Sequence, residues 1–205
     1  MKFSFLHLTV ISLTLLAVVA GCSSTPPVQV SPAPTPAPVA IPTRTLDPVL
    51  LSLILSPEEV PFTVANEKSQ IPDLLDPLLS EFGAVRGYTR YVINQKTDSP
   101  SAVQLGQMIV EYPTGNATRA FTRFVEQNRK AAPSQYVITW LPDPKIGDES
   151  VALTINDATG SAKPMAMVVF RKSRYMESVV MISPAPLDTD TLVRTARLAA
   201  ARIPA

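Results

Sequence analysis

The stretch MAMVVFRKSRYMESVVMI at residues 165–182 decides the fold of this chain. Two strongly apolar segments, Met165 to Phe170 and Tyr175 to Ile182, flank the polar residues Arg171-Lys172-Ser173-Arg174. Apolar runs of this length around a polar turn predict two strands joined by a hairpin. Their strongly apolar character indicates strands in the centre of a sheet.

The segment that follows the hairpin, Asp188 to Ile203, predicts a helix. It has acids in its first turn and Arg197 and Arg202 towards its end, as the helix dipole prefers. One stripe is apolar and rich in alanine, so the helix can approach a sheet closely. The stripe consists of Leu192, Ala196, Ala199, Ala200 and Ile203.

Four further strands are expected upstream, from their β-branched and aromatic residues or from alternation. They are Val85 to Asn94, Val103 to Tyr112, Tyr136 to Leu141 and Val151 to Ile155. Apolar residues at helical spacing predict a helix that begins at Asn116, and shorter helices are expected at 47–55 and 76–82. This order predicts an α+β fold: an antiparallel sheet of about six strands, helices on one face, and the C-terminal helix last.

The hairpin around Phe170-Arg171-Lys172 and the alanine-rich helix Leu192 to Ile203 resemble the lipid-tethered sensor-type domains of actinobacterial lipoproteins and kinase ectodomains, which are related in shape to PsbP-like domains. The resemblance covers the last third of the chain, and the rest matches in element order. It implies a binding or accessory role without catalytic residues. Many of the kinase ectodomains contain disulfides, which this chain cannot form within itself because it has one cysteine.

The N-terminal residues predict an export signal over residues 1–21. Lys2 provides a basic start, and an apolar run of signal-peptide length extends from Leu8 to Ala20. The tetrapeptide Val19-Ala20-Gly21-Cys22 resembles the lipobox of prokaryotic lipoproteins. That resemblance implies cleavage before Cys22 and acyl chains, such as palmitate, on this residue. The alternative is an uncleaved transmembrane anchor.

Residues 22–45 follow as a lipidated cysteine and a proline-rich tether, whose small residues and prolines favour an extended polyproline-II conformation. Residues 46–205 are expected to fold as one domain. The expected location is the outer side of the cell membrane, or the outer membrane of a double-membraned host. The expected partners are the lipid bilayer, through Cys22, and an unknown envelope ligand or protein.

Composition excludes several classes of function. The chain contains one histidine, His7, and one cysteine, Cys22, so residues 46–205 have neither imidazole nor thiol. Catalysis by Ser-His-Asp or Cys-His groups and zinc sites of His and Cys are therefore excluded. Lysines and arginines number 18 against 17 acids, and without Lys2 the balance is 17 against 17. This neutral balance argues against a nucleic-acid partner.

Arg86, Tyr88 and Arg90 alternate along one expected strand and therefore share a face. Guanidinium groups and an aromatic ring on one face are a candidate site for an anionic or sugar ligand. The alternative interpretation is a solvated sheet face. A basic hairpin tip at Arg171, Lys172 and Arg174 is a candidate contact for acidic lipid or glycan, with a solvated turn as the alternative.

Asp143, Asp148 and Glu149 are candidate ligands for a cation, because hard ions take oxygen ligands. Their spacing does not match an EF-hand loop, and a structural turn at Gly147-Asp148 is the favoured interpretation. Asn116-Ala117-Thr118 fits the N-glycosylation pattern. Capping of the following helix explains Asn116 equally.

The leading hypothesis is an extracytoplasmic binding, sensor or accessory domain that is monomeric, needs no cofactor and is not an enzyme. The alternative is a carboxylate-dependent hydrolase of envelope glycans, since aspartates and glutamates remain available for acid-base chemistry. No pair of acids can be assigned to such a reaction from the sequence.

Overall fold

The structure is a computed structural model of the 205-residue chain. It describes residues 47–74, 76–95, 101–130, 135–160, 162–184 and 186–205. Every described residue belongs to one compact unit, Leu46–Ala205.

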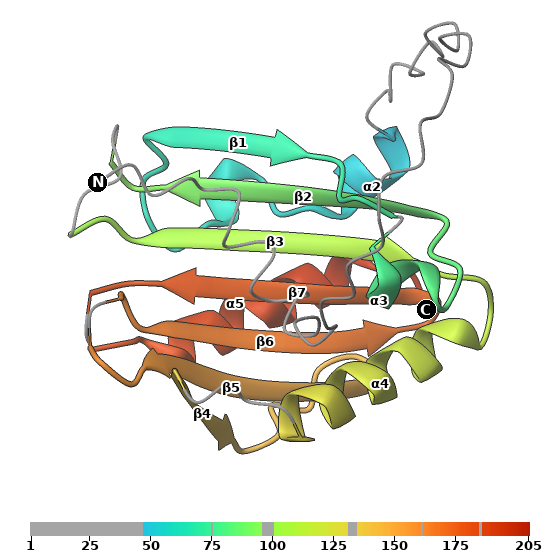
Figure 1. Ribbon diagram of the computed structural model, residues 1–205. Coiled ribbons are helices and arrows are strands. Elements are labelled where there is room, and N and C mark those ends of the chain that lie inside the picture. The colour runs from blue at the N-terminus through green and yellow to red at the C-terminus, as the bar shows by residue number, and fades with distance from the viewer. Residues whose placement is uncertain (1–46, 75, 96–100, 131–134, 161, 185) are drawn as a thin grey trace, which may run out of the picture. The chain divides into compact units, whose positions relative to one another are not determined.

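This unit is built on one seven-stranded sheet in which all neighbouring strands are antiparallel (Figure 1). Its order is β1-β2-β3-β7-β6-β5-β4, so the two strands of residues 165–182 lie in the interior of the sheet, as predicted. The strands are β1 (Asn66–Gln70), β2 (Arg86–Ile93), β3 (Gln104–Glu111), β4 (Tyr136–Leu141), β5 (Glu149–Asp157), β6 (Met165–Lys172) and β7 (Tyr175–Ile182).

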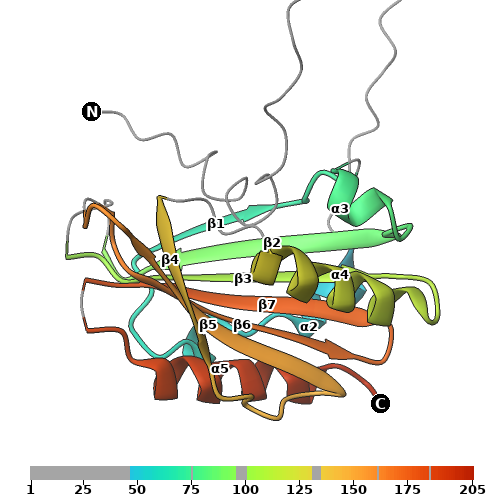
Figure 2. The same ribbon diagram turned by 60° about the horizontal axis from the view of Figure 1, so that its bottom comes forward.

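Helices cover both faces of this sheet (Figure 2). On one face lie α5 (Thr189–Arg202) and α2 (Pro48–Leu53), and on the other lies α4 (Asn116–Lys130). A 3-10 helix, Pro57–Glu59, follows α2, and the short helix α3 (Pro77–Ser80) contacts α4. We call residues 47–60, which include α2 and the 3-10 helix, the N-terminal strap.

Strand β6 is apolar from Met165 to Phe170 because both of its faces are covered. Along β6, Val168 and Phe170 pack in the core beneath α5, whereas Met167 and Val169 pack against Phe121 of α4. Successive residues of a strand point to opposite faces, so one strand contributes to both cores. This two-sided burial explains the unbroken apolar run in the sequence.

Helix α5 packs through its small residues, as its alanine stripe predicts. Ala196 and Ala199 are fully buried, and Leu192 lies in the same core. Asp188 caps the helix, because its side chain accepts a hydrogen bond from the Thr191 backbone N–H at 2.8 Å.

The α+β class, the antiparallel sheet and the final helix are confirmed, and two details differ. The sheet has seven strands rather than about six, because β1, with the polar sequence NEKSQ, lacks any apolar pattern. As a short strand at the sheet edge, it leaves four of its five side chains exposed. The expectation of helices on one face was wrong, because α4 forms a second core on the opposite face.

Candidate functional site

A cavity of about 340 Å³ lies at one end of the sheet. Three segments form it: the turn between β3 and α4, the β6–β7 hairpin tip, and the residues after α5. Its lining consists of Thr114, Gly115, Ser173, Arg174, Tyr175, Pro204 and Ala205. The volume suits a small ligand.

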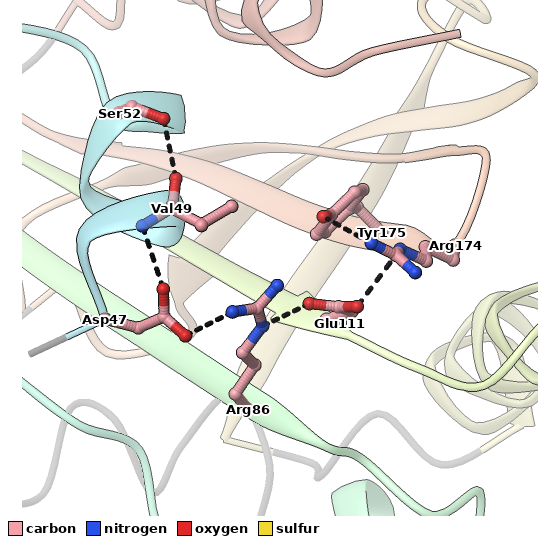
Figure 3. A network of polar contacts seen from close by, with 7 residues as sticks. All are labelled: Asp47, Val49, Ser52, Arg86, Glu111, Arg174 and Tyr175. Atoms are coloured by element: carbon pink, nitrogen blue, oxygen red, sulfur yellow. Dashed lines mark hydrogen bonds and ion pairs between the residues drawn. The ribbon is translucent and has the colours of Figure 1, made fainter.

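A chain of ion pairs leads from this cavity to the start of the strap (Figure 3). Arg174 contacts Glu111 at 3.0 Å, and Glu111 also pairs with Arg86. Arg86 in turn pairs with Asp47. The guanidinium of Arg174 lies 5.5 Å from the centre of the Tyr175 ring. We call these five residues the outer cluster.

Sheet register places the outer cluster. Arg86 begins β2 and Glu111 ends β3, and the two are directly opposite each other. Glu111 is also opposite Tyr175, the first residue of β7. Three strand ends therefore align one acid between two basic side chains. Asp47 joins them because it caps α2, accepting a hydrogen bond from the Val49 N–H at 2.8 Å.

The charges of the outer cluster stabilise one another. The hydrogen bond from Arg86 lowers the pKa of Asp47, which therefore stays ionised. Glu111 and Asp47 raise the pKa of Arg86. The contact with Tyr175 and the charge of Glu111 raise the pKa of Arg174.

A second polar group, which we call the inner cluster, lies deeper on the same sheet face and holds the strap by its backbone. It consists of Arg90, Gln107 and Glu177. Leu55 donates its backbone N–H to Gln107 at 3.0 Å and accepts from Arg90 through its carbonyl oxygen. Arg90 also pairs with Glu67 of β1 at 2.7 Å.

Glu177 is the unusual member of the inner cluster. Its side chain accepts a hydrogen bond from the Gln107 amide, while Oε2 has no partner among the described residues. Burial raises the pKa of Glu177 to about 8. The carboxyl group is therefore protonated at neutral pH, because a buried charge without a cationic partner is unfavourable. Neither Glu177 nor Glu111 lines the cavity.

Arg86, Tyr88 and Arg90 do share one face of β2, but that face is covered. Tyr88 is 4% exposed and Arg90 is 8% exposed. The expectation of a solvated face is therefore wrong, because the strap covers these residues and binds both arginines. A ligand-binding role for the three residues stays a prediction.

The acids Asp143, Asp148 and Glu149 all have partners within the chain. Asp148 and Glu149 both pair with Arg171 at 2.7 Å. Lys145 and Ser150 donate to Asp143, and these hydrogen bonds lower its pKa to about 2. Among the described residues, no group of three or more His, Cys, Asp or Glu is placed to hold a metal ion.

The turn at Gly147 explains why these acids lie where they do. Gly147 has φ +64°, and a Cβ at this position would collide with the Arg171 carbonyl oxygen. A residue with a side chain is therefore excluded, and the close approach brings Asp148 beside the hairpin tip. There Asp148 also accepts a hydrogen bond from the Ser173 N–H at 2.8 Å.

The basic residues of the hairpin tip are not a solvated turn. The strands continue to Lys172, so the tip is only Ser173 and Arg174. Lys172 donates to the Ala200 carbonyl at 3.0 Å, near the end of α5, and Arg171 pairs with two acids. Arg174 faces the cavity with its side chain 51% exposed.

Two other candidates have different outcomes. Asn116 is the first residue of α4, and its side-chain amide donates to the Phe82 carbonyl at 3.0 Å. It therefore ties the turn after α3 to the start of α4, and glycosylation of Asn116 stays a prediction. Cys22, the predicted lipidation residue, lies outside the described residues.

Sequence reasoning missed Asp47, Glu111 and Tyr175 as members of a site. Glu111 is the last residue of an apolar strand, and Tyr175 is the first of another. A charged residue at the end of a predicted central strand indicates a site only when the strand order, and therefore its neighbours, are known. Here β3 pairs with β7, which is distant in sequence, and the order was not predicted.

Comparison with known proteins identifies a similar fold. No family model and no curated protein matches the sequence. Among solved structures, the extracellular domain of PknH from Mycobacterium tuberculosis matches with a TM-score of 0.54 at 10% sequence identity. The match covers 75% of this chain and 95% of that domain. The resemblance to kinase ectodomains is therefore confirmed at the level of the fold.

The described helices are all short or polar. Within the described ranges, none is long and apolar enough to cross a membrane.

Proposed function

We propose that this chain is an exported lipoprotein whose residues 46–205 form an extracytoplasmic binding or sensor domain. Cleavage before Cys22 leaves this residue as the lipidated N-terminus, and residues 22–45 tether the domain to the outer side of the membrane. Two acyl chains on one residue give a stable anchor.

One observation carries this proposal: the fold covers 95% of a solved extracellular domain, so the likeness extends over that whole domain. The sequence before residue 46 supports the same location, because it contains an apolar run followed by Cys22, as in an export signal with a lipidation site. The cavity at the sheet end supplies a place for a ligand.

The test exploits the single cysteine of the chain. The full-length protein is expressed in a bacterial host that processes lipoproteins, denatured, and treated with a maleimide–polyethylene glycol reagent. Lipidated Cys22 has no free thiol, so we expect no mass increase. Mass spectrometry of the N-terminal peptide is expected to show Cys22 with its acyl groups.

The matched variants are Cys22→Ala and Ser24→Ala. We expect Cys22→Ala to accumulate as the precursor or to leave the membrane fraction, and Ser24→Ala to be processed normally. Proteinase K added to intact cells, after outer-membrane permeabilisation where one exists, is expected to digest the domain. An intact Met1 in membrane-bound protein would instead show a signal anchor.

A further inference from the structure

We infer that the cavity beside the hairpin tip binds a small ligand through a carboxylate or phosphate group that Arg174 holds. The inference rests on the proposed function, because it names the site and the ligand class of the binding domain. Three observations carry it: the orientation of Arg174, the free donors around the cavity, and the neutralisation of nearby acids.

The guanidinium of Arg174 is already oriented. Its Nε contacts Glu111 at 3.0 Å, and its Cζ lies 5.5 Å from the ring centre of buried Tyr175. Arg86 occupies the other carboxylate oxygen of Glu111, so Glu111 binds Arg174 through one oxygen only. A guanidinium held in this way loses little further conformational entropy when it binds an anion.

The terminal end of Arg174 is free to bind. Apart from a long contact of 3.5 Å between Nη2 and the Tyr175 hydroxyl, the two terminal nitrogens have no partner among the described residues. Two adjacent N–H groups match the two oxygens of a carboxylate or phosphate. Thr114 and Ser173 also line the cavity, and each carries a hydroxyl group that can donate a hydrogen bond.

The acidic side chains that contact Arg174 and Ser173 are already engaged by cations or backbone donors. Glu111 lies between Arg86 and Arg174, and Asp148 accepts from Arg171 and from the Ser173 N–H. Their repulsion of an incoming anion is therefore reduced. The cavity volume of about 340 Å³ limits the ligand to a small molecule or to the head of a larger one.

The experiment is a calorimetric titration of the full, lipidated protein in nonionic detergent. Inorganic phosphate and succinate are added to millimolar concentrations, and sodium chloride keeps the ionic strength constant. We expect saturable binding with a one-to-one ratio, and a rise in melting temperature with ligand concentration.

Three variants test the role of Arg174. Arg174→Gln is expected to weaken binding about tenfold or more, because a charge-assisted hydrogen bond is lost. Arg174→Lys keeps the positive charge but lacks the two adjacent N–H groups. Its affinity is expected to lie between those of wild type and Arg174→Gln. The control Arg194→Gln removes an arginine of α5 whose partner is Thr191, and we expect unchanged affinity.

Glycerophosphoglycerol, the headgroup of phosphatidylglycerol, distinguishes the source of the anion. Tighter binding than inorganic phosphate assigns the site to a lipid headgroup, and equal or weaker binding assigns it to a free anion. Absence of saturable binding, or equal binding by Arg174→Gln, overturns the inference. That result leaves the processing of Cys22 untouched, so failure here is distinguishable from failure of the proposed function.

Discussion

The outer and inner clusters lie on the same sheet face but surround their carboxylates in opposite ways. In the outer cluster Glu111 forms ion pairs with two guanidinium groups, and Asp47 forms one. In the inner cluster Glu177 has only the Gln107 amide as its partner among the described residues. The pKa of Asp47 is lowered by its arginine partner, whereas the pKa of Glu177 is raised by burial.

Cationic partners and solvent access together explain this difference. The side chain of Glu111 is only 8% exposed, but it is paired with two arginines. The outer cluster lies at the sheet end, where Arg86 and Asp47 are each 29% exposed and charges keep part of their hydration. Glu177 is 1% exposed, so its ionised form would lose hydration without gaining a cation. The outer cluster is therefore suited to exchange partners with a ligand, whereas the inner cluster is suited to hold the strap.

The largest effect is expected for Arg90→Met, which keeps the length of the side chain but removes its donors. The Leu55 carbonyl then lies buried without its donor, and Glu67 loses its partner. We expect the free energy of unfolding to fall by about 3 kcal/mol.

Urea unfolding of the full-length protein in detergent measures this change. Arg197→Met is the control, because Arg197 also donates to a backbone carbonyl, that of Pro144, but is exposed. A loss for Arg90→Met no greater than that of the control would contradict the assigned role of the inner cluster.

A pH-dependent effect is expected for Glu177→Gln, which should gain stability relative to wild type as pH rises towards 8. The folded-state pKa of about 8 lies above the unfolded value of about 4.3. Between these values the unfolded chain releases a proton that the folded chain keeps, so wild-type stability falls as pH rises and levels off above pH 8.

Melting temperatures of wild type and Glu177→Gln at pH 5 and pH 8 test this expectation. The melting temperature of the variant is expected to rise relative to that of wild type as pH increases, because the glutamine has no proton to release on unfolding. Parallel pH profiles of the two proteins would show that Glu177 is ionised in the folded state.

The smallest effect is expected for Asp47→Asn. Asparagine still caps α2, so only the charge of the pair with Arg86 is lost. We expect a loss of about 0.5 to 1 kcal/mol at neutral pH, reduced by solvent screening. Because Arg86 lowers the pKa of Asp47, the difference should disappear as pH falls below the folded-state pKa.

The matched control is Asp188→Asn, which alters the cap of α5 while the strap stays intact. Urea unfolding at pH 7 and pH 2.5 compares the variants. A loss for Asp47→Asn that persists unchanged at the lower pH would show that the capping hydrogen bond, rather than the ion pair, holds the strap.

The sequence predicted most elements of the fold because their patterns are local. The apolar segments gave β4 and β7 with the expected ends, and the alanine stripe gave α5. β1 was missed because four of its five residues are exposed and polar, and only pairing with β2 makes it a strand. The side of the sheet covered by α4 was missed because β6 is apolar on both faces.

The candidate site was predicted only in part. Arg86 and Arg174 were named as candidates, but in two separate groups of residues. Their connection runs through Glu111, which neighbours both because β3 lies between β2 and β7. Strand order depends on how distant segments pack together, and periodicity within one segment does not contain it.

By itself, the sequence determined the α+β class, the central hairpin, the final helix, and the absence of imidazole and thiol from residues 46–205. These properties follow from composition and from the spacing of apolar residues along the chain. Tertiary structure decided that Arg90 lies beneath the strap, that Arg171 takes up Asp148 and Glu149, and that Arg174 faces a cavity. The physical reason is that a charged side chain is buried, paired or free according to the neighbours that folding brings to it, and those neighbours come from distant parts of the chain.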